Sequence, residues 1–426
     1  MKNLFISLSI ILVAHVPLAA QETDAKKDLE KAKAEMIREA DDEQQPNYTK
    51  AVNLLKGVVS KEPGNATAWY FYGYALDKLN IPDGEHIPAA TYTLTEQAST
   101  AFEKAVSLSN DIYTGELILL DPHTKILSVW GSLALKYLNE GKRDSALLCL
   151  RKSALQGGIN RTVLTYFKQV INECSSNAYF FTNGDMYLYY LNYLQLVEKF
   201  RVDVNCIDLN LLNTKWYSTW QAARNKLPVS FGPADLAKLE AKKWEEKLVS
   251  IDNKNPRFSD SSVTWKLSAT YDKKYLLRSD QVLLDVLQQN GFRKDVFFAA
   301  DVPPYMWLFL NDYLQCRGLT NKLVTKKDSN DLNMLTERLK SLPYLPSSSR
   351  TYLNNRDNIQ VLNNYRFAYT TVAGIALQKD KAAIAQRLME SVEGKYPETT
   401  LPFFAEETKQ WFAQLKKKIK SKVSLE

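Results

Sequence analysis

Small and large hydrophobic residues alternate along residues 130–150 at the spacing of two antiparallel helices. The positions are Trp130, Leu133, Ala134, Tyr137, Gly141, Ala146 and Leu150. Ala or Gly at a helix crossing lets two backbones approach, and larger apolar residues fill the flanks. Gly141 suits the tight turn between the helices. The pattern therefore predicts a helical hairpin.

The same spacing occurs upstream and keeps its phase. Ala51, Leu55 and Val58 fit the second helix of one unit, which Pro63 ends, and Trp69 opens the next unit six residues later. The second helix of that unit comes late, so residues 81–93 are expected to loop out as an insertion. This spacing resembles tetratricopeptide repeats, whose stacked hairpins form a surface that holds other molecules. A generic helical bundle is the alternative interpretation.

A further helical pair is predicted near the carboxyl end, over residues 364–395, followed by a final helix from Phe403. The final helix has Trp411 and Phe412 on one face and several lysines elsewhere. Two interpretations stay open for it. It is either a basic amphipathic segment that touches anionic lipid or an acidic partner, or the solvated cap of a helical array.

The periodicity changes between residues 177 and 325. Strands are expected at residues 178–182, 202–209, 263–268 and 295–300, and helices at residues 187–200, 216–226, 279–290 and 305–317. Strand–helix–strand order with long connections predicts parallel pairing. The predicted fold is thus mixed and mainly α, with tetratricopeptide-like hairpins flanking a small α/β module that has a parallel sheet.

Five segments follow from these patterns. They are a signal peptide at 1–20, a charged leader helix at 21–45, helical repeats at 46–176, the α/β module at 177–325, and a carboxy-terminal helical region at 326–426 with the basic end helix.

Short polar side chains follow the predicted strands. Asn183 and Asp185 come after the first strand, Asn213 and Thr214 after the second, and Asp301 after a later one. The carboxyl ends of parallel strands line the crevice where ligands bind in such sheets. These five residues are therefore candidate ligand contacts for a hydroxyl-rich, sugar-like or phosphosugar molecule. Asn-Gly-Asp is also a turn former, and Asn-Thr before a helix is also an N-cap.

Longer motifs in the middle of the chain carry a family resemblance. They include Phe181-Thr182-Asn183-Gly184-Asp185, Asn210-Leu211-Leu212-Asn213-Thr214-Lys215-Trp216-Tyr217, Val296-Phe297-Phe298-Ala299 and Asp312-Tyr313-Leu314-Gln315. Residues 178–325 resemble the soluble carboxy-terminal portion of bacterial membrane proteins related to protein O-mannosyltransferases. The resemblance implies a relative of that soluble portion, joined to added helical repeats.

Two departures limit what the resemblance transfers. This chain has Gly184-Asp185-Met186-Tyr187-Leu188 where the family usually has Gly-Asp-Asn-Asp-Thr. The multi-span membrane portion, which carries the lipid-linked donor site in related glycosyltransferases, has no counterpart in the sequence. No residue for donor chemistry is therefore transferred.

The amino terminus predicts export. Lys2, an apolar run from Leu4 to Val13 and the small pair Ala19–Ala20 have the order of a secretory signal, with cleavage near Ala20. A retained anchoring helix is the alternative, although the run is short for a membrane span. A periplasmic or secreted protein without a membrane span after signal removal is expected.

Charge and composition limit the kinds of ligand and catalytic site that the sequence can be expected to have. The formal net charge is +7, with acidic and basic residues interspersed, which does not indicate nucleic-acid binding. Only three histidines occur, one of them in the predicted signal, so no catalytic residue, metal site or cofactor is assigned. Four cysteines lie far apart, and a Cys149–Cys174 bridge is less expected than four buried thiols.

Two functions remain as hypotheses. The first is an exported helical-repeat scaffold that binds a protein partner or a glycan-like ligand in the cell envelope, without enzyme activity. The alternative is an enzyme or accessory subunit of glycan or glycosyl transfer. Its carboxylates would come from Asp185, Asp203, Asp208, Asp285 and Asp301.

Overall fold

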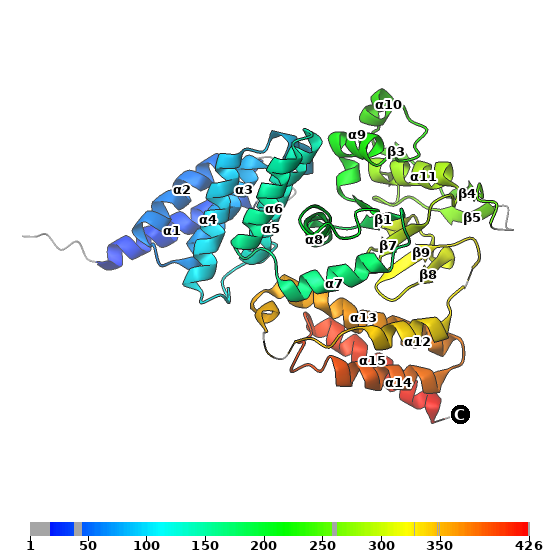
Figure 1. The fold of residues 1–426 in the computed structure, drawn as a ribbon. Coiled ribbons are helices and arrows are strands. Elements are labelled where there is room, and N and C mark those ends of the chain that lie inside the picture. The colour runs from blue at the N-terminus through cyan, green and yellow to red at the C-terminus, as the bar shows by residue number, and fades with distance from the viewer. Residues whose placement is uncertain are drawn as a thin grey trace, which may run out of the picture.

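The computed structural model describes residues 18–37, 45–257, 262–327, 329–346, 348 and 350–424. Almost all of the predicted signal peptide and the end of the predicted leader helix lie outside the described residues. The protein is mainly helical, with a small sheet between two groups of helices (Figure 1). Among the described helices, none has the length and apolarity to cross a membrane.

The first group contains six helices that each pack against the next (Figure 1). They are α1 (Leu18–Met36), α2 (Tyr48–Lys61), α3 (Ala66–Asn80), α4 (Tyr92–Leu108), α5 (Pro122–Asn139) and α6 (Arg143–Leu155). Local capping explains several of their starts. The side chains of Asn47, Asn65 and Thr91 each accept a hydrogen bond from the backbone N–H three residues later. The expected insertion forms a short 3₁₀ helix, η1 (Gly84–Ala89), which packs against α5.

Small residues permit close helix packing in this group. A Cβ atom added to Gly73 on α3 would lie 2.9 Å from the ring of Phe102 on α4. Trp130 on α5 is fully buried, and its indole N–H donates to Ser99 Oγ on α4 at 2.9 Å. These fitted pairs add specific contacts to the apolar packing of the group.

Helix α5 also joins the helical group to the central module, because it packs against α8 (Asp185–Leu196). Gly131 lies against the ring of Tyr189, which an added Cβ would approach to 2.3 Å. The hydroxyls of Ser132 and Tyr189 lie 2.7 Å apart. The glycine thus makes room for a tyrosine that is bonded in place by the adjacent serine.

The central sheet has five strands in the order β2-β1-β7-β9-β8. They are β1 (Tyr179–Thr182), β2 (Asn205–Asp208), β7 (Val296–Ala299), β8 (Leu314–Cys316) and β9 (Thr320–Leu323). β1 pairs in parallel with β2 and β7, whereas β9 is antiparallel to both β7 and β8. The prediction of parallel pairing is therefore correct for β1, β2 and β7 but wrong for the sheet as a whole. A β8–β9 hairpin that turns at Gly318 (φ +112°) adds an antiparallel edge.

The remaining elements of the module surround this sheet. The helices are α9 (Lys215–Arg224), α10 (Pro233–Lys238), α11 (Arg278–Asn290) and the 3₁₀ turn η2 (Leu211–Asn213); the two small ribbons pair β3 (Lys242–Lys243) with β6 (Tyr275–Leu276), and β4 (Lys247–Asp252) with β5 (Ser262–Leu267). β5 was expected as a strand, and it alternates between exposed and buried positions. It lies in an antiparallel ribbon rather than in the central sheet.

The helix expected at residues 305–317 is wrong. The segment forms η3 (Pro304–Trp307), η4 (Asn311–Tyr313) and β8. Leu308 and Phe309 have φ values of +59° and +58°, which end any right-handed helix. The Leu308 carbonyl accepts the indole N–H of Trp265 on β5 at 2.8 Å, so a contact distant in sequence stabilises the irregular backbone.

The second helical group follows the sheet. It contains α12 (Leu332–Ser341), η5 (Thr351–Asn354), α13 (Arg356–Gln378), α14 (Ala382–Lys395) and α15 (Glu406–Val423). The expected pair and final helix are present, with α13 starting earlier than predicted. α13 also contacts α7 (Arg161–Asn172), the helix that connects the first group to β1 (Figure 1).

The lysines of α15 are partly paired. Phe412 and Ile419 are buried, while Lys416 bonds Glu393 at 2.6 Å and Lys422 bonds Asp380 at 2.7 Å. Helix α15 therefore packs on α14 through Phe412 and Ile419, whereas Trp411 is 46% exposed. The four cysteines, all described, are unpaired, with Cys206 partly exposed and the other three buried.

Glu173 connects α7 to the β8–β9 hairpin. Its carboxylate accepts hydrogen bonds from Leu319 N at 3.0 Å and Thr320 Oγ1 at 2.8 Å. Burial raises the pKa of Glu173 to about 7 despite these bonds. The folded protein therefore binds a proton here that the unfolded chain releases between about pH 4.5 and 7.

We expect Gly131→Ala to lower the free energy of unfolding by about 1–3 kcal/mol or more, because the new methyl group collides with Tyr189. Gly374→Ala on α13 is the matched control, since nothing lies within 4 Å of a Cβ there. It should be neutral or stabilising by up to about 1 kcal/mol. Chemical denaturation measures both values, and equal effects of the two substitutions would contradict the proposed contact.

Because the pKa of Glu173 is raised, we expect the free energy of unfolding to depend on pH. Stability contributed by the protonated carboxyl is complete below about pH 4.5 and is lost as pH rises toward 7. Relative to Glu173→Gln, the wild-type protein should therefore lose up to about 3 kcal/mol of unfolding free energy over this range. The control is Glu337→Gln, an exposed glutamate on α12. Parallel stability curves for wild type and Glu173→Gln would rule out the raised pKa.

Candidate functional site

The strand order creates a crevice at the carboxyl ends of β1 and β7. From β1 the chain runs through α8 to β2 on one side, whereas β7 pairs with the opposite side of β1. Such a reversal leaves the loops after the two central strands diverging, and ligands bind in the space between them in open α/β sheets. The position of the candidate site thus follows from topology.

A hollow of about 530 Å³ lies at this position. Its walls come from the loops after β1, β2 and β7, the first residues of α8, helix α13, and the segments that precede α5 and α15. The polar lining residues are Asn183, Asp185, Tyr187, Asn210, Asp301, Asp357, Gln360 and Asn364. Leu119, Phe367 and Phe404 are among the apolar ones.

The Asn183–Asp185 corner is held by a buried carboxylate at the end of β2. Gly184 has φ +89°, a conformation that favours glycine, and its N–H donates to Asp208 Oδ2 at 2.7 Å. The other Asp208 oxygen accepts Leu211 N–H at 2.9 Å. Burial raises the pKa of Asp208 to about 6. Asp208 thus fixes two loops relative to each other rather than facing the hollow.

Asp185 is positioned by the first helical group. It is the first residue of α8, and its Oδ2 atom accepts a hydrogen bond from Ser128 Oγ on α5 at 2.5 Å. A carboxylate at a helix amino terminus is favoured by the helix dipole. The orientation of this carboxylate therefore depends on how α5 packs against α8.

Asp301 is held by the opposite wall. Asn364 on α13 donates to its Oδ2 atom at 3.4 Å, and the Tyr187 hydroxyl also bonds it. The Tyr187 hydroxyl lies 3.0 Å from that of Tyr166, which Asn364 also contacts at 3.1 Å. Asp301 is exposed to the hollow but enclosed by protein elsewhere, and this burial raises the pKa of its carboxyl.

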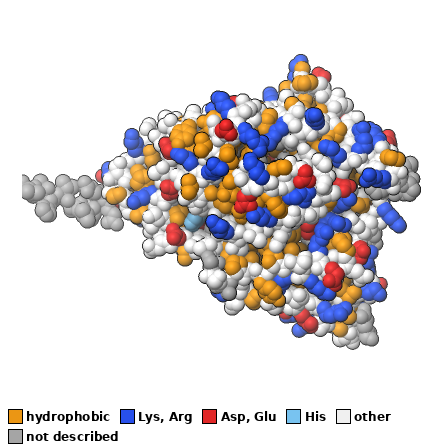
Figure 2. All heavy atoms as spheres, viewed as in Figure 1, with side chains coloured by type: hydrophobic (Ala, Val, Ile, Leu, Met, Phe, Trp, Pro, Cys, Tyr) orange, Lys and Arg blue, Asp and Glu red, His pale blue; other side chains and the backbone are white. Residues whose placement is uncertain are grey.

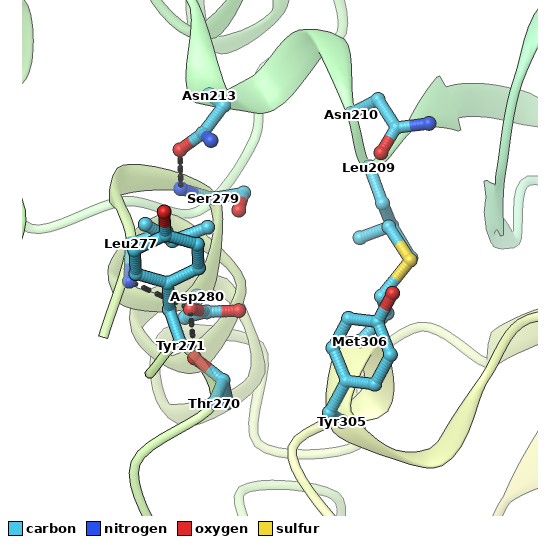
Figure 3. Close-up of a pocket in the computed structure, with 10 residues that line it drawn as sticks. All are labelled: Leu209, Asn210, Asn213, Thr270, Tyr271, Leu277, Ser279, Asp280, Tyr305 and Met306. Atoms are coloured by element: carbon cyan, nitrogen blue, oxygen red, sulfur yellow. Dashed lines mark hydrogen bonds between the residues drawn. The ribbon is translucent and has the colours of Figure 1, made fainter. Parts of the chain in front are cut away.

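The structure separates the five predicted contacts. Asn183, Asp185 and Asp301 line the hollow together. Thr214 is buried and caps α9, since its Oγ1 atom accepts Tyr217 N–H at 3.3 Å. Asn213 accepts Ser279 N–H at 3.2 Å and lines a smaller neighbouring hollow, shown in Figure 3. The turn-and-cap interpretation thus describes Thr214.

Two other candidate carboxylates serve the fold. Asp203 pairs with Arg201 at 3.0 Å, and Asp285 accepts both Ser230 N–H at 2.6 Å and Ser230 Oγ–H at 2.8 Å. Neither lines the hollow. The lining residues on α13 were not predicted, because α13 is far along the chain and carries no motif that marks it as part of the site; they include Asp357, Gln360 and Asn364.

The hollow is acidic and has no basic side chain among its described lining residues. Burial also raises the pKa of Asp357, whose carboxylate accepts Asp121 N–H at 2.9 Å. Among the described residues, no group of three or more His, Cys, Asp or Glu side chains is placed to hold a metal ion. Phosphate groups favour Arg and Lys, so the lining fits a neutral hydroxyl-rich molecule better than a phosphosugar.

Comparison with known proteins supports the resemblance of the middle of the chain. A family model described as TMEM260-associated domain 2 matches residues 164–254 and 240–341. This is consistent with the similarity to proteins related to protein O-mannosyltransferases. The matched span includes the loops of Asn183 and Asp301 but not α13. No curated protein matches the chain.

Proposed function

We propose that this protein binds a neutral saccharide in the hollow at the carboxyl ends of β1 and β7. The proposal rests on the lining of this hollow, which lies at a topological switch point: its described residues supply carboxylate and carboxamide groups and aromatic rings, and none of them is basic. Carboxylates and amides accept and donate the hydrogen bonds that hydroxyl groups require. Phe367 and Phe404 supply apolar surface for the C–H faces of a sugar ring.

We further propose that the helices flanking the module are tetratricopeptide-like and bind a protein partner in the cell envelope. The spacing around Trp69 and Trp130 and the consecutive packing of α2 to α6 support the repeat assignment. The amino-terminal sequence supports export. Lys/Arg and Asp/Glu side chains are interspersed over the face in Figure 2, which fits a protein-binding role better than a nucleic-acid interface.

The alternative is glycosyl chemistry at the same hollow. It is favoured by the position of Asp301, whose carboxyl lines the hollow and has a pKa raised by burial. A carboxyl group with a raised pKa suits a proton donor. Asp185 would supply the second carboxyl group. Product analysis of a bound saccharide separates the two functions: hydrolysis or transfer that is lost in Asp301→Asn favours the enzyme, and an unaltered saccharide favours the binding role.

Saccharide binding predicts a specific loss in Asp301→Asn. Replacing the carboxylate should weaken affinity at least about tenfold, because a hydrogen bond to a charged group contributes about 1.5–3 kcal/mol. Residues 21–426 would be screened against an array of neutral and anionic glycans, and the best ligand measured by calorimetry. Neutral glycans should be preferred.

Asp312→Asn is the matched control, since Asp312 is exposed, pairs with Lys327 and lies outside the hollow. It should bind as the wild type does. The proposal fails if no glycan binds, or if Asp301→Asn and Asp312→Asn retain the same affinity.

A further inference from the structure

A second hollow, of about 190 Å³, adjoins the first. Figure 3 shows its two walls. Asn213, Ser279, Thr270 and Tyr271 lie on one side, and Asn210, Leu209, Met306 and Tyr305 lie on the other. Drug-sized ligands occupy about 300–1,000 Å³, so this hollow is too small for a whole ligand of that size. It has the size of a side compartment.

One residue belongs to both hollows. Asn210 lines each of them, and its Nδ2 atom donates to Asn183 Oδ1 at 2.5 Å. In Figure 3 the Asn210 amide nitrogen points away from the second hollow, while its oxygen lies on the hollow side. The hydrogen-bonded pair of Asn183 and Asn210 therefore separates two compartments at the same edge of the sheet. A ligand that occupies both compartments passes Asn210.

Two tyrosine rings flank the second hollow. Tyr271 is 56% exposed and Tyr305 is 48% exposed, and they stand on opposite walls (Figure 3). Both come from ordered backbone: Tyr271 forms a bridge with Tyr275, and Tyr305 lies in η3. Exposed tyrosine combines an apolar ring face with a polar hydroxyl, which suits a molecule that is itself apolar on its faces and polar on its rim.

The lining chemistry continues from the first hollow to the second. Asparagine, serine and threonine side chains accompany the tyrosines, and none of the described residues that line the second hollow is basic. Asp280 has a structural role, because its Oδ2 atom accepts hydrogen bonds from Leu277 N–H at 2.7 Å and from Thr270 Oγ–H at 2.5 Å. A neutral, hydroxyl-rich unit therefore fits both compartments.

We propose that the two hollows form one cleft for an oligosaccharide of at least two neutral units. One sugar unit lies over the ends of β1 and β7, the oligosaccharide passes Asn210, and the next sugar unit lies between Tyr271 and Tyr305. The inference rests on the proposed saccharide binding and adds the length of the ligand. An extended peptide fits less well, because none of the described residues that line the two hollows belongs to a strand with which a peptide main chain could pair.

The test uses length ladders of glucose, mannose, xylose and N-acetylglucosamine, from one to six units, with residues 21–426. For the sugar that binds, affinity should rise at least tenfold from one unit to the longer oligomers. Tyr271→Ala and Tyr305→Ala should each remove about three- to tenfold of the longer oligomer's affinity. Neither should change the affinity for a single unit.

Tyr344→Ala provides the control for loss of an exposed tyrosine, since Tyr344 lies outside both hollows. It should leave all affinities unchanged. Absence of binding by every sugar in the ladders overturns the saccharide function itself. Binding that is lost in Asp301→Asn but does not depend on length or on Tyr271 and Tyr305 overturns only the extended cleft. Preference for an unglycosylated peptide at the same residues also overturns it.

Discussion

The close packing of α5 against α8 is the contact on which the candidate site depends. Gly131 admits the Tyr189 ring, Ser132 bonds the Tyr189 hydroxyl, and Ser128 bonds Asp185. These contacts lie within two turns of α5, so one helix of the first group both anchors the central module and orients a carboxylate in the hollow. A protein partner that shifts α5 would therefore also move Asp185. In the proposed function, partner binding on the first helical group would therefore be coupled to ligand binding in the hollow through this junction.

The opposite wall of the hollow is also formed by a helix that packs against other parts of the fold. Helix α13 packs against α7 and α14, and it presents Gln360 and Asn364 to the hollow. Asn364 contacts Asp301, Tyr166 and Tyr187 at once, so α7, α8, α13 and the loop after β7 meet at one polar cluster. Buried polar groups of this kind are costly unless bonded, and here they bond one another. The cluster thus fixes Asp301 while leaving one side open to the hollow.

Local sequence signals predicted much of this structure. The strand at residues 179–182, the turn at Asn183-Gly184 and helix α8 follow from a short apolar run, an Asn-Gly-Asp turn sequence and an apolar helical stripe. The placement of Asn183, Asp185 and Asp301 at one edge followed from parallel pairing, which holds for β1, β2 and β7. The capping by Thr214 was predictable as an alternative but could not be chosen from sequence alone.

Contacts between distant segments decided the rest. Residues 305–317 have helical periodicity, yet Leu308 adopts a left-handed conformation because its carbonyl pairs with Trp265, some forty residues away. Likewise, Asn364 joins Asp301 only after α13 docks on α7. No local pattern encodes either contact, so neither the antiparallel edge of the sheet nor half of the site's wall was predicted.

The most direct test of the central claim is hydrogen–deuterium exchange with and without the best-binding neutral saccharide. Exchange should slow at residues 183–187, which form the turn after β1 and the first residues of α8, at residues 300–303, and in the part of α13 that includes Asn364, with the remaining helices unchanged. Protection confined to α2–α6 or to α14 and α15, with the strand ends unaffected, would contradict it.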